Sequence, residues 1–161
     1  MAYVLQAVIA SPTIFGQQQF PESRLVNLSQ GMCLLPLTTG LRKHLNIPDL
    51  SLTDTDDGMV PATNKLPQEI AKFCLSLSQN GRVAYLEAEF FGSGVQASAV
   101  FEEGRHIQTL ISTGQERVGA INSALQLLGV TTGDYRDEFD ALKLGQYRDT
   151  DKWVQGSIPT A

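Results

Sequence analysis

Positive charge is scarce in this sequence. It contains 12 Lys and Arg against 17 Asp and Glu, a formal net charge of −5 over 161 residues. Because no cluster of Lys and Arg occurs, we expect no nucleic-acid binding through phosphate neutralisation. Residues 46–64 contain no Lys or Arg, are rich in Pro, Asp, Thr and Gly, and predict a long surface loop. Most of the excess negative charge lies there, on Asp49, Asp54, Asp56 and Asp57.

Long apolar runs and cysteines are also few. The apolar run at residues 2–10 is too short to span a membrane, and no positive charge precedes it as in a signal peptide, so we expect neither. The two cysteines, Cys33 and Cys74, lie among apolar neighbours. We interpret them as buried reduced thiols of a cytoplasmic protein, with a disulfide as the alternative.

The usual signatures of nucleophilic, metal and phosphate sites are absent. No G-x-S-x-G, H-E-x-x-H or C-x-x-C occurs, and Gly92 and Gly94 are not followed by the G-K-[ST] of a phosphate loop. The segment from Asp54 to Gly58 has the composition of a calcium loop, but its glycine comes early and Lys65 stands where a bidentate Glu is needed. We therefore expect no cofactor and no metal.

Hydrophobic periodicity predicts an α+β fold in a single domain over residues 1–155, with a disordered tail at 156–161. We expect a mostly antiparallel sheet of five or six strands with two main amphipathic helices packed on one face. Strands are predicted at 2–10, 24–28, 31–37, on both sides of a turn within 81–103, and at 106–112. The helices have buried stripes formed by Ile70, Phe73, Cys74 and Leu77, and by Val118, Ile121, Leu125 and Leu128, the second one starting from a capping box at Thr113 and Glu116.

Shorter helices and a docked tail complete the predicted fold. A helix at 40–45 would be capped by Thr38 or Thr39, and helical turns are expected at 136–143 and, capped by Thr150, at 151–154. The only tryptophan, Trp153, lies in this tail, so we expect the tail to be held by its aromatic side chains.

The rest of the chain is organised around the hairpin at 81–103. With a turn at Gly92-Ser93-Gly94, Tyr85 would lie opposite Phe101 and Glu87 opposite Ala99. Alternation puts Leu86 and Phe90 on one face, which we expect to be the core and to carry the first helix. The opposite face, with Tyr85, Glu87, Glu89, Phe91 and Phe101, is expected to remain uncovered.

Glu87 and Glu89 are the strongest catalytic candidates. Their spacing along a strand would place the carboxyl groups within the range used by acid/base pairs in glycoside hydrolysis, and proximity would raise one pKa. His106 is a third candidate, although nothing in the sequence sets its register. The alternative is that both acids belong to a solvated polar face.

Two binding surfaces are predicted. Asp54, Asp56 and Asp57 would steer a basic protein partner, and the alternative is a loop that only increases solubility. The aromatic residues Tyr85, Phe91 and Phe101 would form a recess or would be buried between the subunits of a homodimer.

The second half of the chain resembles a group of small uncharacterised bacterial proteins. The resemblance lies in GRVAYLEAEFFGSGVQASAVF (81–101), AINSALQLLGV (120–130) and DEFDALKLGQYRDTDKW (137–153). Those proteins carry an A-Y-x-E-x-E/D-[FY]-F-G-G-x-G-x-Q-A-like segment and a D-E-F-D-x-L-x-L-G-x-[YH]-R-like tail. Here Ser93 stands where a second glycine is expected, and residues 1–66 are not covered.

The resemblance implies no activity and no catalytic residues. In size, such proteins are similar to the immunity proteins that neutralise bacterial toxins. We therefore expect a small acidic bacterial protein-binding module of the toxin-immunity kind rather than an enzyme. A hydrolase that uses Glu87 and Glu89, and a homodimer without a catalytic role, are the alternatives.

Overall fold

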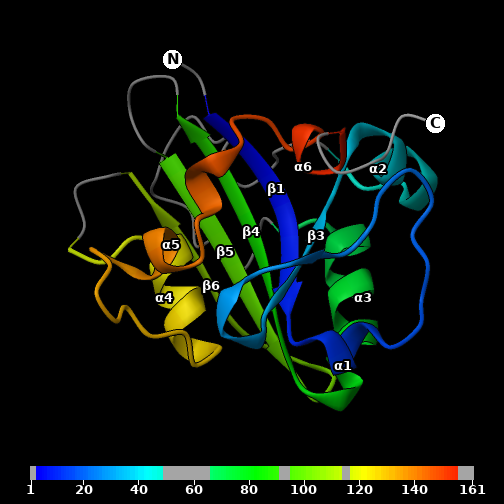
Figure 1. Ribbon diagram of the computed structural model, residues 1–161. Coiled ribbons are helices and arrows are strands. Elements are labelled where there is room, and N and C mark those ends of the chain that lie inside the picture. Colours follow the sequence, from blue (N-terminus) through cyan, green and yellow to red (C-terminus); the bar gives the residue numbers. More distant parts are fainter. Residues whose placement is uncertain (1–2, 49–65, 91–94, 114–116, 156–161) are drawn as a thin grey trace.

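The sheet is the centre of the molecule (Figure 1). The structure, a computed structural model, describes residues 3–48, 66–90, 95–113 and 117–155, except for the side chains of Phe90 and Gln155. The strands pair in the order β2-β3-β1-β4-β5-β6, and every pair is antiparallel. The strands are β1 (Tyr3–Ala10), β2 (Val26–Asn27), β3 (Cys33–Pro36), β4 (Arg82–Phe90), β5 (Val95–Glu102) and β6 (Arg105–Ser112).

Six α-helices accompany the sheet in the described residues, and the predicted α+β class with a mostly antiparallel sheet is confirmed. Short 3₁₀ turns occur at Ser29–Gly31, Ser78–Asn80 and Leu144–Gln146. The helices are α1 (Pro12–Phe15), α2 (Thr39–Leu45), α3 (Gln68–Leu77), α4 (Ala120–Leu127), α5 (Glu138–Ala141) and α6 (Lys152–Gln155).

The predicted helix signals at α2 and α3 are confirmed. The hydroxyl oxygen of Thr38 accepts a hydrogen bond of 3.2 Å from the Leu41 amide, which is the N-cap bond of α2. In α3, which follows Pro67, the side chains of Ile70, Cys74 and Leu77 are buried. These three residues recur at helical spacing and give α3 its apolar stripe.

The start of α4 differs from the prediction. The helix begins at Ala120, after Gly119, so Val118 precedes it and is 43 % exposed instead of buried. Side chains of the sheet take the role of the cap. Ser112 of β6 accepts a hydrogen bond of 2.9 Å from the Ala120 amide, and Gln96 of β5 accepts one of 3.0 Å from the Ile121 amide. These contacts satisfy two amides at the open end of the helix.

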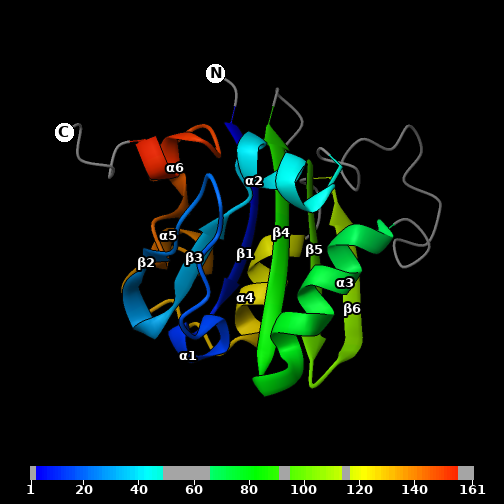
Figure 2. The same cartoon turned by 90° about the vertical axis from the view of Figure 1, so that its right-hand side faces the viewer.

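The two longest helices lie on opposite faces of the sheet, which corrects the prediction of one covered face (Figure 2). The stripe of α3 belongs to one buried cluster, together with Val83, Tyr85 and Phe101, whereas Ile121 of α4 packs with Leu86 in the other. The physical reason is that both faces of the sheet are apolar, so each needs a layer of its own. The expectation that the Tyr85 face remains uncovered is therefore wrong.

The hairpin keeps its predicted faces with a different register. Tyr85 lies opposite Ala99 and Glu87 opposite Ala97, each two residues from the predicted partner. Within the described residues, the pairing runs from Arg82 and Glu102 to Glu89 and Val95. Because side chains alternate along a strand, a shift of two residues leaves every side chain on the same face.

The C-terminal tail packs against the first half of β1, where β3 does not reach. The pairing of β3 with β1 covers residues 7–10 only. Ahead of that span, the Val4 amide donates to the carbonyl oxygen of Arg148 (2.9 Å), and the Tyr3 hydroxyl donates to that of Leu144 (2.7 Å). Trp153 is 1 % exposed and its ring packs edge-on against Tyr147. The expectation of a docked tail is thus confirmed for residues up to 155, and the predicted disordered segment 156–161 lies outside the described residues.

Candidate functional site

A buried polar cluster joins β1 and β4 on the face covered by α3. Gln6 of β1 lies opposite Glu87 of β4, and Tyr85 precedes Glu87 on the same side of the sheet. The Tyr85 hydroxyl donates a hydrogen bond of 2.5 Å to Oε1 of Glu87 and accepts one of 2.9 Å from Nε2 of Gln6. Tyr85 and Glu87 have no exposed surface and Gln6 has 1 %. The central predicted acid is therefore a member of the core.

Strand alternation and small neighbours explain this cluster. Tyr85 and Glu87 project to the same side of β4, and the residues opposite them on β5 are Ala99 and Ala97. Two alanines leave room for a tyrosine ring and a carboxyl group on this side of the sheet. Cys74 of α3 belongs to the same buried cluster as Tyr85.

The electrostatics of the cluster favour a protonated tyrosine. Burial raises the pKa of Tyr85 well above its ordinary value of 10.0, and the charge of Glu87 and the hydrogen bond to it add to this effect, while the bond from Gln6 lowers the pKa. Tyr85 is consequently a hydrogen-bond donor to Glu87 at every physiological pH. It is not poised to act as a base.

Gln6 connects the cluster to two other parts of the chain. Its Nε2 also donates to the carbonyl oxygen of Pro48 (3.0 Å), at the start of the acidic segment 46–64. The backbone amide of Gln6 donates to the hydroxyl of Thr150 (3.0 Å), and that hydroxyl donates to the carbonyl oxygen of Val4 (3.3 Å). The backbone carbonyl oxygen of Gln6 accepts a hydrogen bond from the Leu37 amide (2.8 Å). Gln6 thus holds the sheet, the segment after α2 and the tail together.

The other two catalytic candidates do not lie in an open site with Glu87. Glu89 is half-buried, two residues along β4, opposite Val95 of β5. His106 is exposed, lies opposite Phe101 and stacks on it with ring centroids 4.9 Å apart; its Nε2 shares a hydrogen bond with the hydroxyl of Thr109. His106 is two strands across and five residues along the sheet from Glu87, roughly 15 to 20 Å at ordinary strand spacing. The structure does not bring the three together.

The predicted binding residues have different positions. Tyr85 and Phe101 are fully buried within one chain. The prediction that Tyr85 and Phe101 form a recess or a homodimer interface is therefore wrong, because α3 already packs on them within one chain. Phe91, Asp54, Asp56 and Asp57 lie outside the described residues.

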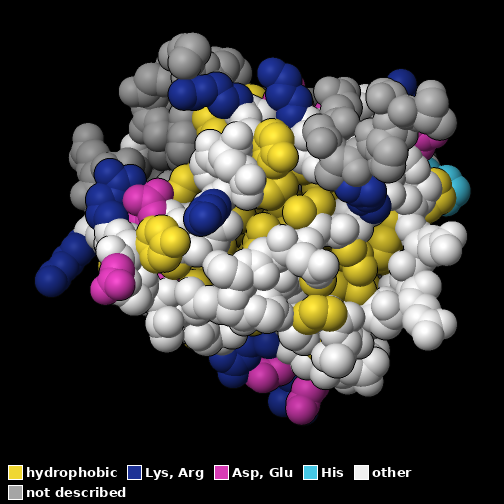
Figure 3. All heavy atoms as spheres, viewed as in Figure 1, with side chains coloured by type: hydrophobic (Ala, Val, Ile, Leu, Met, Phe, Trp, Pro, Cys, Tyr) yellow, Lys and Arg dark blue, Asp and Glu magenta, His cyan; other side chains and the backbone are white. Residues whose placement is uncertain are grey.

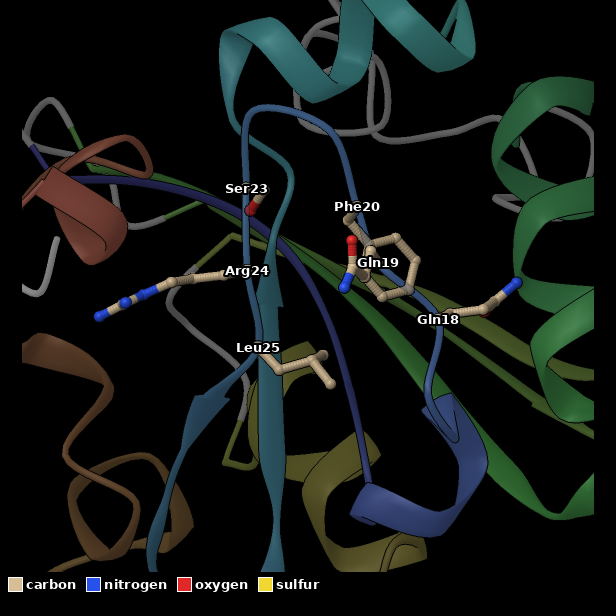
Figure 4. A pocket seen from close by; sticks show the side chains of 6 residues that line it. All are labelled: Gln18, Gln19, Phe20, Ser23, Arg24 and Leu25. Atoms are coloured by element: carbon tan, nitrogen blue, oxygen red, sulfur yellow. The ribbon is translucent and has the colours of Figure 1, made fainter.

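A surface pocket of about 310 Å³ lies along the segment between α1 and β2 (Figure 4). Phe20 forms its apolar wall and packs edge-on against Phe15 and Phe73. The side chain of Arg24 extends away from the other lining groups (Figure 4). None of the predicted catalytic residues belongs to the lining, which consists of Gln18, Gln19, Phe20, Ser23, Arg24 and Leu25.

Within the described ranges, no group of three or more His, Cys, Asp or Glu side chains is placed to hold a metal ion. Lys and Arg side chains are scattered over the face shown in Figure 3 and form no continuous patch there. No helix in the part of the chain that the structure describes is long and apolar enough to cross a membrane.

Sequence reasoning did not predict the contacts of Gln6 with Pro48 and Thr150. The available signal was Gln6 itself, because an amide in the middle of the apolar run 2–10 needs hydrogen-bond partners when that strand is buried. Its partners were not predictable, since Thr150 is 144 residues away in sequence. Cys33 and Cys74 are both buried and free, as expected for thiols that form no disulfide.

Comparison of the chain with protein-family models, with curated proteins and with solved structures finds no match in any of the three.

Proposed function

We propose that this protein is a non-catalytic protein-binding module of the toxin-immunity kind, which binds a basic protein partner through its acidic segment 46–64. The observation that carries the proposal is the complete burial of Glu87. It turns the best catalytic candidate of the sequence into a structural group, and the acidic segment is then the strongest remaining functional feature.

The burial of Glu87 argues against the alternative of a hydrolase. An acid/base pair must reach the bond that it cleaves, with both carboxyl groups on the substrate. Glu87 has no exposed surface, and the Tyr85 hydroxyl, 2.5 Å away, occupies one of its oxygens. Glu89 would have to catalyse hydrolysis without the second carboxyl group.

The described residues at the two ends of the acidic segment are held by the folded core. At its start, Ile47 is 6 % exposed and the Pro48 carbonyl oxygen accepts the hydrogen bond from Gln6. After its end, Leu66 packs against the cluster that contains Tyr85. In the sequence, the four carboxylates of Asp49, Asp54, Asp56 and Asp57 lie between these two anchors. A basic surface would be attracted to them, with an effect mainly on the association rate.

Charge neutralisation within the segment tests the proposal. The triple variant Asp54→Asn, Asp56→Asn, Asp57→Asn and the wild type are each immobilised, and proteins retained from a lysate of the source organism at low salt are identified. A purified protein that only the wild type retains is then titrated by stopped flow. We expect the association rate with the wild type to fall about tenfold or more between about 0.05 and about 0.3 M salt, and to be far less salt-dependent with the triple variant.

A matched control separates position from net charge. Glu22, Glu103 and Asp134 are exposed acids outside the segment. Their replacement by the corresponding amides changes the net charge by the same amount and is expected to leave the association rate within about threefold of wild type. A partner that binds both triple variants equally well, or the absence of any partner that only the wild type retains, contradicts the proposal.

A further inference from the structure

The two edges of the sheet differ in length and in protection. The β2 edge is two residues long, which leaves little backbone for another strand to pair with. The β6 edge is eight residues long and, among the residues that the structure describes, it pairs only with β5 (Figure 2). A long unpaired strand presents free backbone amides and carbonyls, so it is the edge at which a sheet can be extended.

The features that normally block such an edge lie in the first part of β6. Arg105 and His106 are charged or polar and exposed, and the pairing with β5 is interrupted by a bulge between Val100 and Phe101, which leaves Ile107 without a partner on β5. The remaining part, residues 108–112, pairs regularly with β5 and contains no charged residue. Leu110, in its middle, is 36 % exposed.

We propose that two copies of this chain associate through residues 108–112 of β6, paired antiparallel about a two-fold axis at Leu110. The two six-stranded sheets would become one continuous sheet. This inference goes beyond the proposed function, because it involves neither the acidic segment nor another protein.

A second copy is the occupant that the sequence of this stretch fits best. A two-fold axis at residue 110 places Leu110 opposite Leu110 of the second copy, Gln108 opposite Ser112 and Thr109 opposite Ile111. Residues that face each other are then both even-numbered or both odd-numbered, so their side chains project to corresponding sides of the two sheets. Each face of one sheet therefore continues into the same face of the other. The exposed leucines cover each other, and no like charges meet within the stretch.

A second exposed apolar side chain lies near the same edge. Val118 is 43 % exposed and lies two residues before Ala120, whose amide is bound to the Ser112 hydroxyl. Ser112 and Leu110 project to the same side of β6, as does Ser98 on β5, whose hydroxyl donates to the Ala120 carbonyl oxygen (2.7 Å). Val118 is therefore an exposed apolar residue close in sequence to a point where α4 is bound to the β6 edge.

Sedimentation equilibrium of the wild type from about 1 to about 300 µM tests the association, a range that populates complexes of micromolar affinity. We expect a concentration-dependent mass that reaches twice the monomer mass and does not exceed it. Leu110→Lys places two positive charges opposite each other, and the dimer is expected to weaken at least about tenfold. Ile107→Lys is the matched control, because Ile107 is on the same strand and also exposed but lies within the bulge, and the dimer is expected to change by less than about threefold.

Cross-linking keeps the proposal testable even if Leu110→Lys does not fold. Opposed residues of paired antiparallel strands have Cα atoms about 4.5–5.5 Å apart, within the range that a disulfide spans. Leu110→Cys is expected to form a disulfide-linked dimer under mild oxidation, whereas Ile107→Cys is not; the native cysteines are buried. The proposal is overturned if the protein is a monomer at every concentration, if its mass exceeds that of the dimer, or if the two cysteine variants cross-link equally. A monomer would leave the β6 edge available to a strand of another protein.

Discussion

Tyr85 and Glu87 are joined by a 2.5 Å hydrogen bond in the interior of the protein, where neither side chain has any exposed surface. Their spacing along the strand places a carboxyl group and a phenol on one face of the sheet. The elements that pack on that face determine whether the two groups are accessible to a substrate or buried. Here α3 packs with Tyr85 in one buried cluster, and Glu87 is buried beside it, so the pair is a structural contact.

Removal of the Tyr85 hydroxyl should destabilise the fold without any effect on surface binding. Tyr85→Phe removes the donor to Glu87 and the acceptor for Gln6, so two buried polar groups lose a partner. We expect the free energy of unfolding to fall by about 2–4 kcal/mol, measured by urea denaturation followed by circular dichroism. Glu89→Gln, at a half-buried position on the same strand, is the control and should cost less than about 1 kcal/mol. Equal losses for the two variants would contradict the assignment of Tyr85 and Glu87 to the core.

The hydroxyl of Thr150 should be essential for the docking of the tail. Thr150→Val keeps the shape of the side chain but leaves the buried backbone amide of Gln6 without its acceptor. We expect the free energy of unfolding to fall by about 1–3 kcal/mol. Hydrogen exchange followed by mass spectrometry should also show faster exchange in residues 144–155. Thr13→Val is the matched control, because its exposed hydroxyl bonds only to that of Ser11, 3.1 Å away. Unchanged exchange in the tail would show that other contacts hold it.

Stability should decline at alkaline pH. Burial raises the pKa of Cys74 above its ordinary value of 9.0, and the pKa values of Tyr3 and Tyr85 above 10.0. A group with a raised folded-state pKa contributes stability that is fully present below its unfolded pKa and is lost as the pH rises, because the unfolded chain releases a proton that the folded chain retains. Each group should lower the free energy of unfolding by about 1.4 kcal/mol per pH unit above its unfolded pKa.

Urea titrations between about pH 8 and about pH 11 measure this decline. It should begin near pH 9 with Cys74 and become steeper above pH 10 with the two tyrosines. Cys74→Ala should lower the slope by about 1.4 kcal/mol per pH unit both between these two values and above them, because the raised pKa of Cys74 persists beyond pH 10. Part of the slope from pH 9 should remain, since burial also raises the pKa of Cys33. A free energy of unfolding that does not change up to about pH 11 would contradict the burial of these groups.

Local periodicity was sufficient for most of the elements. The stripe of Ile70, Phe73, Cys74 and Leu77 predicted α3, although Phe73 is only partly buried. Alternation in β4 separated the faces of Tyr85 and Leu86 correctly even though the register differed by two residues. Periodicity cannot tell which of two apolar faces a helix covers, because Val83, Tyr85 and Phe101 are as suitable for packing as Leu86 and Val100.

The contacts of the candidate site depend on long-range packing. Gln6 meets Tyr85 and Thr150 only after β1 has paired with β4 and the tail has docked. Thr150 has the sequence position of a helix cap before α6, yet its hydroxyl bonds to the backbone of β1. Side-chain partners so distant in sequence leave no periodic signal, which is why the cluster was not predicted.

The burial of Glu87 is the central claim, and carboxyl footprinting tests it most directly. The folded protein is treated with a carbodiimide and an amine, and the labelled sites are quantified by mass spectrometry over time. The exposed acids Glu69 and Glu103 should be labelled quickly, whereas Glu87 should be labelled only as fast as the whole protein unfolds. Labelling of Glu87 at the rate of Glu103 under native conditions would show an accessible carboxyl group on the Tyr85 face and would restore the hydrolase as the better explanation.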